Sequence, residues 1–172
     1  IIKNENLLKK IYKKFLISNA KGYFSPSKSS DEYLKYYGAR NDLIYRYPFT
    51  SLFEADILKE IPSEEEQCNL RKELGIRENK IVLSVGQFIY RKGYDILLKA
   101  CRSLDEEIGV YIIGGKITKE YLDIIKKYNL KNIYFEEFKS KEELSKYYKA
   151  ADLFVLPTRE DIWVLVINEA MA

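Results

Sequence analysis

Two carboxylates lie eight positions apart near the end of the sequence, in T-R-E-D-I-W-V-L-V-I-N-E-A-M-A. Asp161 precedes a run that predicts a helix over residues 163–172, and Glu169 falls about one and a half turns into it. A helix N-terminus presents backbone N–H groups and a partial positive charge, which favour an anion. The two side chains would then bracket a ligand with a phosphate on that N-terminus. The simpler interpretation is that Asp161 favours the helix dipole and Glu169 faces solvent.

A basic pair occurs in a second stretch, S-V-G-Q-F-I-Y-R-K-G, between a predicted strand and a predicted helix. Arg91 could hold a pyrophosphate with its planar fork of donors, and Lys92 with a point charge. Gly86 would let the backbone turn sharply or approach a ligand closely. The stretch matches neither G-x-G-x-x-G nor a Walker A loop, so the fingerprints of NAD and ATP binding are absent. The alternative is a solvated basic pair at a loop.

Two further loops carry residues that could line a site. The stretch I-I-G-G-K ends a predicted strand with paired glycines, which serve either a turn that needs a positive φ or a ligand contact. Phe138, in E-E-F-K-S, could pack on a nucleobase, and the alternative is an ordinary half-buried aromatic side chain. Whether these loops meet depends on the elements that carry them.

Strongly apolar segments alternate with helical patterns from residue 63 onward. Buried strands are predicted by K-I-V-L-S-V-G, V-Y-I-I-G-G, N-I-Y-F-E-E-F and A-D-L-F-V-L-P. Helices are predicted over residues 92–102 and 118–128, and after two capping boxes, Ser63 with Glu66 and Ser140 with Glu143. The side chains expected to point inward from residues 92–102 are Ile96, Leu97, Ala100 and Cys101.

This alternation predicts an α/β fold with a Rossmann-like, doubly wound parallel sheet that is covered on both faces. In such sheets, ligands bind beyond the carboxyl ends of the strands. The loops that should meet at this edge are those following Val85, Ile113, Phe135 and Leu156. Earlier in the chain, the pattern predicts an amphipathic helix within residues 4–19, a strand at 22–26, a helix at 29–38 and a strand that Pro48 ends.

The composition argues against several classes of protein. The net charge of +3 is spread over intermixed Lys and Glu, which argues against nucleic acid as the main partner. The sequence has no His, which removes Ser-His-Asp and Cys-His nucleophilic sites and most zinc sites. Cys68 and Cys101 are isolated and predict small buried side chains in a reducing compartment. No apolar run reaches the ~18 residues of a membrane span, so we expect a cytoplasmic protein.

Four blocks follow one another in a specific order: S-V-G-Q-F-I-Y-R-K-G, I-G-G, F-E-E-F-K-S-K-E-E-L and A-D-L-F-V-L-P-T-R-E-D-I-W-V-L-V-I-N-E-A-M-A. Together they resemble the donor domain of retaining glycosyltransferases of family 4, over roughly residues 22–172. The resemblance implies the GT-B fold, in which two Rossmann-like domains face each other across a cleft. The N-terminal domain would bind the acceptor, and the C-terminal domain a nucleotide-diphosphate sugar, UDP- or GDP-linked.

The resemblance also implies how the donor diphosphate would be held. Arg91 and Lys92 would neutralise the pyrophosphate, whose charge is the main electrostatic demand of glycosyl transfer. Gly86 would permit close approach of the backbone. The backbone amides of Val164 and Leu165 would complete this cradle.

The remaining roles follow from the same resemblance. Glu169 would accept hydrogen bonds from the ribose hydroxyls, and Phe138 or its neighbours would meet the base. Asp161 would be the catalytic residue, contacting the donor sugar and supporting an oxocarbenium-like transition state. The family generally needs no metal and no cofactor beyond the donor substrate, and the lack of a D-x-D motif agrees with that expectation.

The sequence departs from the family pattern at four positions. Gln87 stands where the family usually has Arg, and Asp161 stands where it usually has Glu. Ile162 and Val164 stand where it usually has Gly. A β-branched residue at 164 adds bulk near the expected pyrophosphate and restricts the backbone. This substitution bears on donor affinity more than on the fold.

We expect the chain to be part of a longer protein, because its only Met is Met171 and family members extend beyond both of its ends. Residues 1–60 would be the end of the acceptor domain and the interdomain crossover, and residues 61–172 an incomplete donor domain. The full-length enzyme would be a hexosyltransferase acting on a glycan or lipid-linked acceptor, with peripheral membrane association as an option. The isolated fragment is expected to be inactive.

Two other functions are compatible with the same residues. One is a non-catalytic Rossmann-like nucleotide-binding or scaffold domain whose site is disabled by Val164. The other is an epimerase that uses the same fold and a nucleotide sugar.

Overall fold

A computed structural model describes residues 5–47, 49–161 and 164–172. The chain divides into two compact units, residues 1–50 and 51–172. Two positions singled out in the sequence, Pro48 and Ile162, lie outside the described residues, as does the first residue of the helix predicted over 163–172.

The first unit combines two helices with a short parallel pair of strands. Its elements are α1 (Leu7–Ser18), β1 (Tyr23–Ser25), α2 (Lys28–Tyr36) and β2 (Ile44–Arg46). The strands pair in parallel, with Tyr23 opposite Ile44. Tyr37 is fully buried, and the rings of Tyr33 and Tyr36 pack edge-on against it. The predicted order of helix, strand, helix and strand is therefore confirmed.

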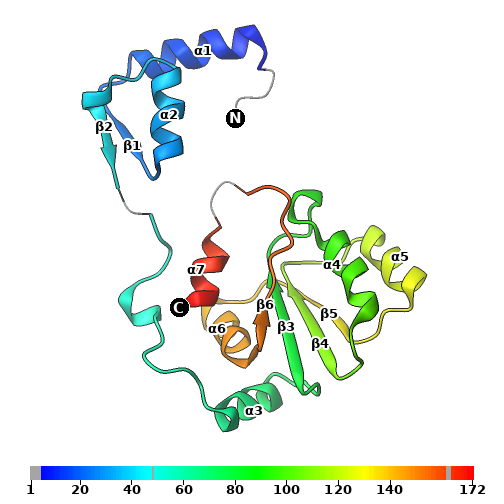
Figure 1. The fold of residues 1–172 in the computed structure, drawn as a ribbon. Helices are drawn as coiled ribbons and strands as arrows, with labels where there is room; N and C mark the ends of the chain where they lie inside the picture. The colour runs from blue at the N-terminus through cyan, green and yellow to red at the C-terminus, as the bar shows by residue number, and fades with distance from the viewer. Residues whose placement is uncertain (1–4, 48, 162–163) are drawn as a thin grey trace. The chain divides into compact units, whose positions relative to one another are not determined.

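The second unit is a four-stranded sheet with helices on both faces (Figure 1). Its strands are β3 (Lys80–Val85), β4 (Ile108–Ile113), β5 (Ile133–Glu136) and β6 (Leu153–Phe154). Its helices are α3 (Glu64–Glu73), α4 (Tyr94–Ala100), α5 (Lys119–Tyr128), α6 (Lys141–Ala150) and α7 (Leu165–Met171). All pairings are parallel, in the order β5-β4-β3-β6. This is the doubly wound α/β arrangement that the alternating pattern predicts.

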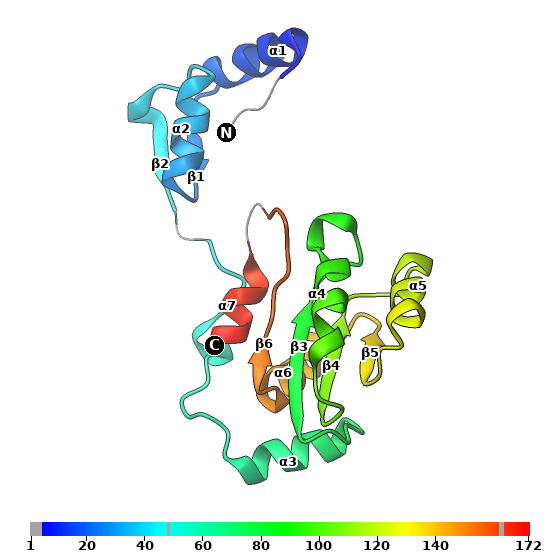
Figure 2. The same ribbon diagram turned by 45° about the vertical axis from the view of Figure 1, so that its right-hand side comes forward.

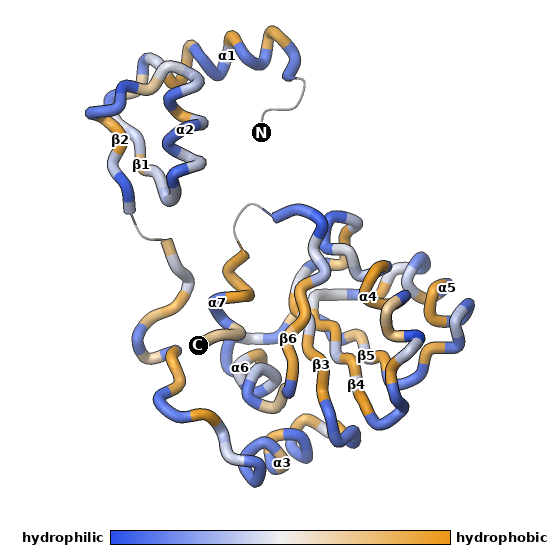
Figure 3. Tube along the Cα trace, viewed as in Figure 1, coloured by the Kyte–Doolittle hydropathy of each residue, from blue (hydrophilic) through white to orange (hydrophobic). Residues whose placement is uncertain are grey.

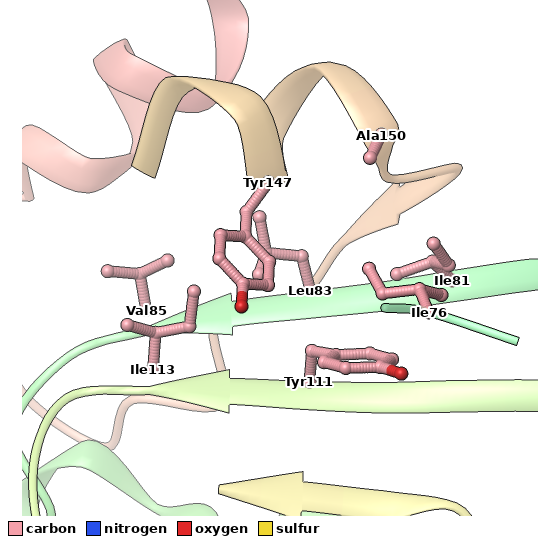
Figure 4. Packing of buried hydrophobic residues seen from close by; sticks show 8 residues of the cluster. All are labelled: Ile76, Ile81, Leu83, Val85, Tyr111, Ile113, Tyr147 and Ala150. Atoms are coloured by element: carbon pink, nitrogen blue, oxygen red, sulfur yellow. The ribbon is translucent and has the colours of Figure 1, made fainter. Parts of the chain in front are cut away.

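The two faces of the sheet bury alternate residues of the same strands, as the pleat requires. On one face, Ile81, Leu83 and Val85 of β3 pack with Tyr111 and Ile113 of β4. Figure 4 shows this cluster, with Tyr147 and Ala150 of α6 above the strands. On the other face, Val110 and Ile112 meet side chains from α4, from the residue that caps its end and from α5, namely Tyr94, Leu97, Leu98, Cys101 and Tyr121. Hydrophobic residues accordingly run along the strands in Figure 3.

Capping residues fix where the helices begin. Ser63 accepts a hydrogen bond from the backbone N–H of Glu66, whose side chain accepts one from the backbone N–H of Ser63. Ser140 and Glu143 make the same reciprocal pair at α6. Both predicted capping boxes are therefore confirmed.

The prediction for the inward face of α4 is wrong at two positions. Ile96 is 48% exposed, and Ala100 is exposed as well. The buried residues recur at the three- and four-residue spacing that begins at Tyr94 and includes Leu97 and Leu98. The buried face therefore includes Tyr94 and Leu98, which the predicted face lacks.

The prediction that both cysteines are buried is correct only in part. Cys101 is buried under the sheet, whereas Cys68 is exposed, and both are free thiols. Cys68 lies on α3, which contacts the core through Leu70 and Leu74 on a different side of the helix.

The strand order creates a switch point between β3 and β6. The chain moves from β3 outward to β4 and β5, and then returns to the opposite side of β3 as β6 (Figures 1 and 2). Ser84 helps to join these two strands, because its hydroxyl donates to the carbonyl of Val155 at 2.6 Å. Connections leave β3 and β6 toward opposite faces, so a crevice forms beyond their carboxyl ends. The two stretches richest in candidate residues follow these two strands.

Candidate functional site

A pocket of about 350 Å³ lies at the carboxyl ends of β3 and β4. Five of the residues predicted from the sequence line it, namely Gly86, Arg91, Lys92, Phe138 and Glu169. These residues come from segments up to 83 positions apart, 86 to 169, so the fold alone brings them together. The prediction of one common edge is thus matched by the geometry.

The floor of the pocket is backbone, because two glycine loops touch there. A Cβ placed on Gly114 would lie 1.8 Å from the carbonyl oxygen of Gly86, so no larger residue fits without moving the loop. The buried Tyr94 hydroxyl donates to the same Gly86 carbonyl at 3.1 Å. Burial raises the pKa of Tyr94 to about 12, which keeps this hydroxyl a donor. The loop at Gly86 is therefore held by the backbone of Gly114, which packs against it, and by the hydrogen bond from Tyr94.

Arg91 and Lys92 face a carboxylate from the loop after β6. Arg91 Nη1 lies 3.2 Å from Asp161 Oδ1, and Lys92 Nζ lies 2.5 Å from Asp161 Oδ2. The side chain of Asp161 is only 10% exposed, whereas that of Arg91 is 40% exposed. The structure therefore joins the two predicted cations with the predicted catalytic acid. Asp161 itself does not line the pocket, and it reaches the pocket through its two partners.

Glu169 forms another part of the wall and is oriented by two hydroxyls. Tyr148 of α6 donates to Oε2 at 3.2 Å, and Ser51 donates to Oε1 at 3.4 Å. Burial, together with the nearby Glu169 carboxylate, raises the pKa of Tyr148, so the phenol stays protonated. The Glu169 carboxylate is therefore oriented at the pocket by hydrogen bonds, and it is not simply a solvent-facing acid.

Phe138 and Lys139 extend the pocket beyond the end of β5. The Phe138 side chain is 69% exposed, and its ring lies 3.4 Å from the point where a Cβ on Gly115 would stand. Lys139 Nζ pairs with Glu136 at 3.0 Å, and this hydrogen bond raises the pKa of the lysine. An aromatic face and a third cation thus lie beside the glycine loop.

Val164 and Leu165 mark the start of α7. Val164 is the N-cap residue, with φ −94° and ψ 73°, and Leu165 is the first helical residue. A φ in this range is open to any L-residue, so the backbone at 164 does not require glycine. Neither residue lines the pocket.

Sequence reasoning misses three residues at this site. Lys139 could have been found by extending the strand-end argument one position past Phe138, since both follow β5. Tyr148 sits within a helix, where its spacing matches that of an ordinary core residue. Ser51 comes from the segment ahead of the sheet, and only the fold brings it to Glu169.

The arrangement is suited to an anionic ligand that also carries hydroxyl groups. Cations lie on one side, an acceptor carboxylate on another, and a glycine floor permits close approach. Within the described ranges, no group of three or more His, Cys, Asp or Glu side chains could hold a metal ion. None of the described helices has the length and apolar content needed to cross a membrane.

Comparisons with known sequences agree on one family. The family model described as glycosyl transferases group 1 matches residues 66–172. The alpha-galactosylglucosyldiacylglycerol synthase of Streptococcus pneumoniae is 32% identical over 113 residues, which cover 62% of this chain and 30% of that protein. The chain spans about 30% of the length of two curated relatives that it matches.

Solved structures share the fold. HepE of Anabaena, in complex with UDP and glucose, aligns with a TM-score of 0.77 at 20% identity, over 97% of this chain and 46% of its own. The C-terminal domain of the group 1 glycosyl transferase LpcC from Francisella tularensis aligns with a TM-score of 0.53 at 23% identity, over 64% of this chain and 62% of its own. The second unit therefore has the fold of the C-terminal domain of GT-B glycosyltransferases.

Proposed function

The chain belongs to the group 1 glycosyltransferases, and we propose that residues 61–172 bind a nucleotide-diphosphate sugar at the carboxyl edge of their parallel sheet. A longer protein containing this chain would transfer the sugar, a hexose, to an acceptor with retention of configuration. The observation that carries the proposal is the meeting of Arg91, Lys92 and Glu169 around one pocket at the switch point of the sheet.

The diphosphate would bind at the two cations. Arg91 offers a planar fork and Lys92 a point charge, and both lie beside the glycine floor formed by Gly86 and Gly114. Asp161 already contacts both cations, so donor binding would replace part of that pairing. Participation of the Val164 and Leu165 amides in this cradle stays a prediction.

The nucleoside would occupy the side of the pocket that Glu169 and Phe138 line. The carboxylate of Glu169, held by Tyr148, would accept hydrogen bonds from the ribose hydroxyls. The exposed ring of Phe138 would offer a stacking face to the base. HepE, which shares this fold, was solved with UDP and glucose, so UDP-glucose is the first donor to test.

Transfer would break the bond between the sugar C1 and the diphosphate oxygen, with both electrons leaving on the diphosphate. The acceptor hydroxyl oxygen would bond to C1 from the same face, and its proton would pass to the leaving phosphate. Arg91 and Lys92 would offset the charge that develops on the leaving group, while Asp161 would support the oxocarbenium-like sugar. Because the side chains already supply positive charge, we propose that no metal is needed.

The acceptor would be bound by the rest of the longer protein. We propose that residues 1–60 contribute to an acceptor domain and to the crossover, with a glycan or lipid-linked acceptor as the substrate class. Catalysis would then require both halves, and residues 1–172 alone would bind a donor without turning it over.

A donor screen on the full-length protein tests this proposal. UDP-, GDP- and ADP-sugars would be incubated with acceptors, with and without EDTA, and NMR would give the anomeric configuration of the product. We expect one donor class to react with retention, and EDTA to leave the rate unchanged. Absence of any nucleotide binding would favour a scaffold domain, and isomerisation of a nucleotide sugar without acceptor would favour an epimerase.

A further inference from the structure

Arg159 belongs to the loop that follows β6, and its side chain makes three contacts with the loop that follows β3 and with the start of α4. Its Nη1 donates to the carbonyl of Tyr90 at 2.7 Å, and its Nη2 donates to Asp95 Oδ2 at 2.7 Å. Its guanidinium also stacks 4.2 Å from the centroid of the Tyr90 ring. One side chain of the second loop thus bonds the first residue of the turn at Tyr90–Lys92, which carries the two cations, and Asp95 in the helix that follows this turn.

The backbones of the two loops are joined at the same place. The N–H of Arg159 donates to the carbonyl of Arg91 at 2.9 Å, and the Thr158 hydroxyl donates to the same carbonyl at 3.2 Å. Gly93 has a φ of +72°, and a Cβ placed on it would lie 2.2 Å from the carbonyl oxygen of Pro157. The two loops are therefore in close contact at Gly93 and Pro157 and are joined by hydrogen bonds, so a shift in one loop would move the other.

We propose that Arg159 is a positioning residue for the diphosphate site, which fixes Arg91 and Lys92 at the distance and orientation that a diphosphate requires. This inference rests on the proposed function. Arg159 does not line the pocket, so it acts through the turn that it holds and not through the ligand. The contacts of Arg159 also hold Asp161, two residues further along the same loop, against the two cations.

The pairing with Asp95 explains why an arginine is needed here. Asp95 is buried at the start of α4, and the Arg159 guanidinium lowers the pKa of its carboxyl, with Lys99 a weaker partner at 3.5 Å. A lysine could keep the charge next to Asp95. It could not also bond the Tyr90 carbonyl in the same plane and stack on the ring, because an ammonium has no planar fork. Arg159→Lys should therefore keep the fold and loosen the turn.

Comparing each nucleoside diphosphate with its monophosphate distinguishes a positioning role of Arg159 from a general loss of structure. The full-length protein would be titrated with UDP and UMP, GDP and GMP, and ADP and AMP, to find the pair that the wild type binds. In that pair, we expect Arg159→Ala to weaken diphosphate binding about tenfold or more and monophosphate binding less than about threefold. Arg159→Lys should fall between wild type and Arg159→Ala.

A matched control is available on the same domain. Arg102 also donates to a backbone carbonyl, that of Lys99, and also stacks on a tyrosine ring, that of Tyr128 at 4.8 Å, but these partners lie outside the turn at Tyr90–Lys92. Arg102→Ala should leave both affinities unchanged. If Arg159→Ala fails to fold, Arg159→Lys and Asp95→Asn provide the same test. In each, the loss of diphosphate affinity is compared with the loss of monophosphate affinity.

The possible outcomes are distinct. An equal loss of diphosphate and monophosphate binding in the Arg159 variants, or no loss in either, would overturn the positioning role. Failure of the wild type to bind any nucleoside diphosphate would instead overturn the proposed function on which that role rests.

Discussion

Two aspartates at opposite ends of the sheet are each paired with one arginine and one lysine. At the amino end, Asp152 lies 2.9 Å from Arg71 and 3.1 Å from Lys80. At the carboxyl end, Asp161 lies 3.2 Å from Arg91 and 2.5 Å from Lys92. The composition of the two clusters is the same, but their surroundings differ.

The amino-end cluster is closed by the backbone. Arg71 donates to the carbonyls of Ala150 and Asn79 at 2.8 to 3.0 Å, and Asp152 accepts from the N–H of Ile81 at 2.7 Å. These bonds join α3, β3 and the segment before β6, so we assign this cluster to stability.

The carboxyl-end cluster is open on one side. Arg91 and Lys92 line a pocket of about 350 Å³, and a glycine loop forms its floor. The charges at this end can therefore meet a ligand, whereas at the other end Arg71 and Asp152 are bonded to backbone groups and the Lys80 side chain, 67% exposed, meets solvent. In a doubly wound sheet this difference follows from the switch point, which separates the connections at the carboxyl end.

Replacing Asp161 should have the largest effect, and it should fall on catalysis. Asp161→Asn removes the charge proposed to support the transition state, so turnover of the full-length protein should fall about 100-fold or more. Nucleoside diphosphate affinity should stay the same or increase, because a carboxylate no longer competes for the two cations. Initial rates and calorimetric titration measure the two quantities. A loss of binding with unchanged turnover would reverse the roles assigned here.

Replacing Arg71 should have the next largest effect, and it should fall on stability. Arg71→Ala removes bonds to two carbonyls and one carboxylate in a half-buried position, so the free energy of unfolding should fall by about 2–4 kcal/mol. Urea denaturation of the chain measures this loss. Lys72→Ala, on the same helix, is the control and should cost less than about 1 kcal/mol. Equal losses in the two variants would contradict the stabilising role of the cluster.

The contribution of Asp152 should depend on pH. Burial raises its pKa, but the Ile81 N–H, Lys80 and Arg71 outweigh burial, so the folded pKa lies below its ordinary value. A lowered pKa stabilises the fold above the unfolded pKa of about 3.9, and the contribution is lost as the pH falls through the folded pKa. The free energy of unfolding of the wild type should therefore exceed that of Asp152→Asn by about 1–2 kcal/mol near pH 7. This difference should disappear as the pH falls below about 4. A gap that is constant with pH would exclude this charge as its source.

Replacing Tyr148 should have the smallest effect. Tyr148→Phe removes the hydroxyl that orients Glu169 and keeps the ring, so the donor KM should rise about three- to fivefold with little change in kcat. Tyr128→Phe, away from the pocket, should change neither quantity. A fall in kcat with unchanged KM would place Tyr148 in the chemical step instead.

The fold could be predicted from the sequence because each layer leaves a local pattern. The strands following residue 79 are short apolar runs, and Ser63 and Ser140 fix two helix starts through bonds that span only three residues. The α4 face was mispredicted because the ring of Tyr94 packs as an apolar residue while its hydroxyl bonds a carbonyl. A tyrosine can be buried in this way only where the structure provides apolar neighbours for its ring and a hydrogen-bond acceptor for its hydroxyl.

The site could be predicted only in its strand-end residues. Arg91, Lys92 and Phe138 follow strands directly, and a parallel sheet brings such positions to one edge. Tyr148 and Arg159 could not be assigned a role, because their partners lie at Glu169 and Asp95, 21 and 64 positions away. Contacts of this kind depend on helix placement and leave no periodic signal.

One titration tests the central claim most directly, that the carboxyl-end cluster binds a nucleoside diphosphate and the amino-end cluster does not. UDP, GDP and ADP would be titrated calorimetrically into the full-length protein and into its Lys92→Ala and Lys80→Ala variants. We expect the preferred diphosphate to bind about 10- to 100-fold more weakly to Lys92→Ala, and with wild-type affinity to Lys80→Ala. Equal affinities in both variants, or a greater loss in Lys80→Ala, would contradict the account.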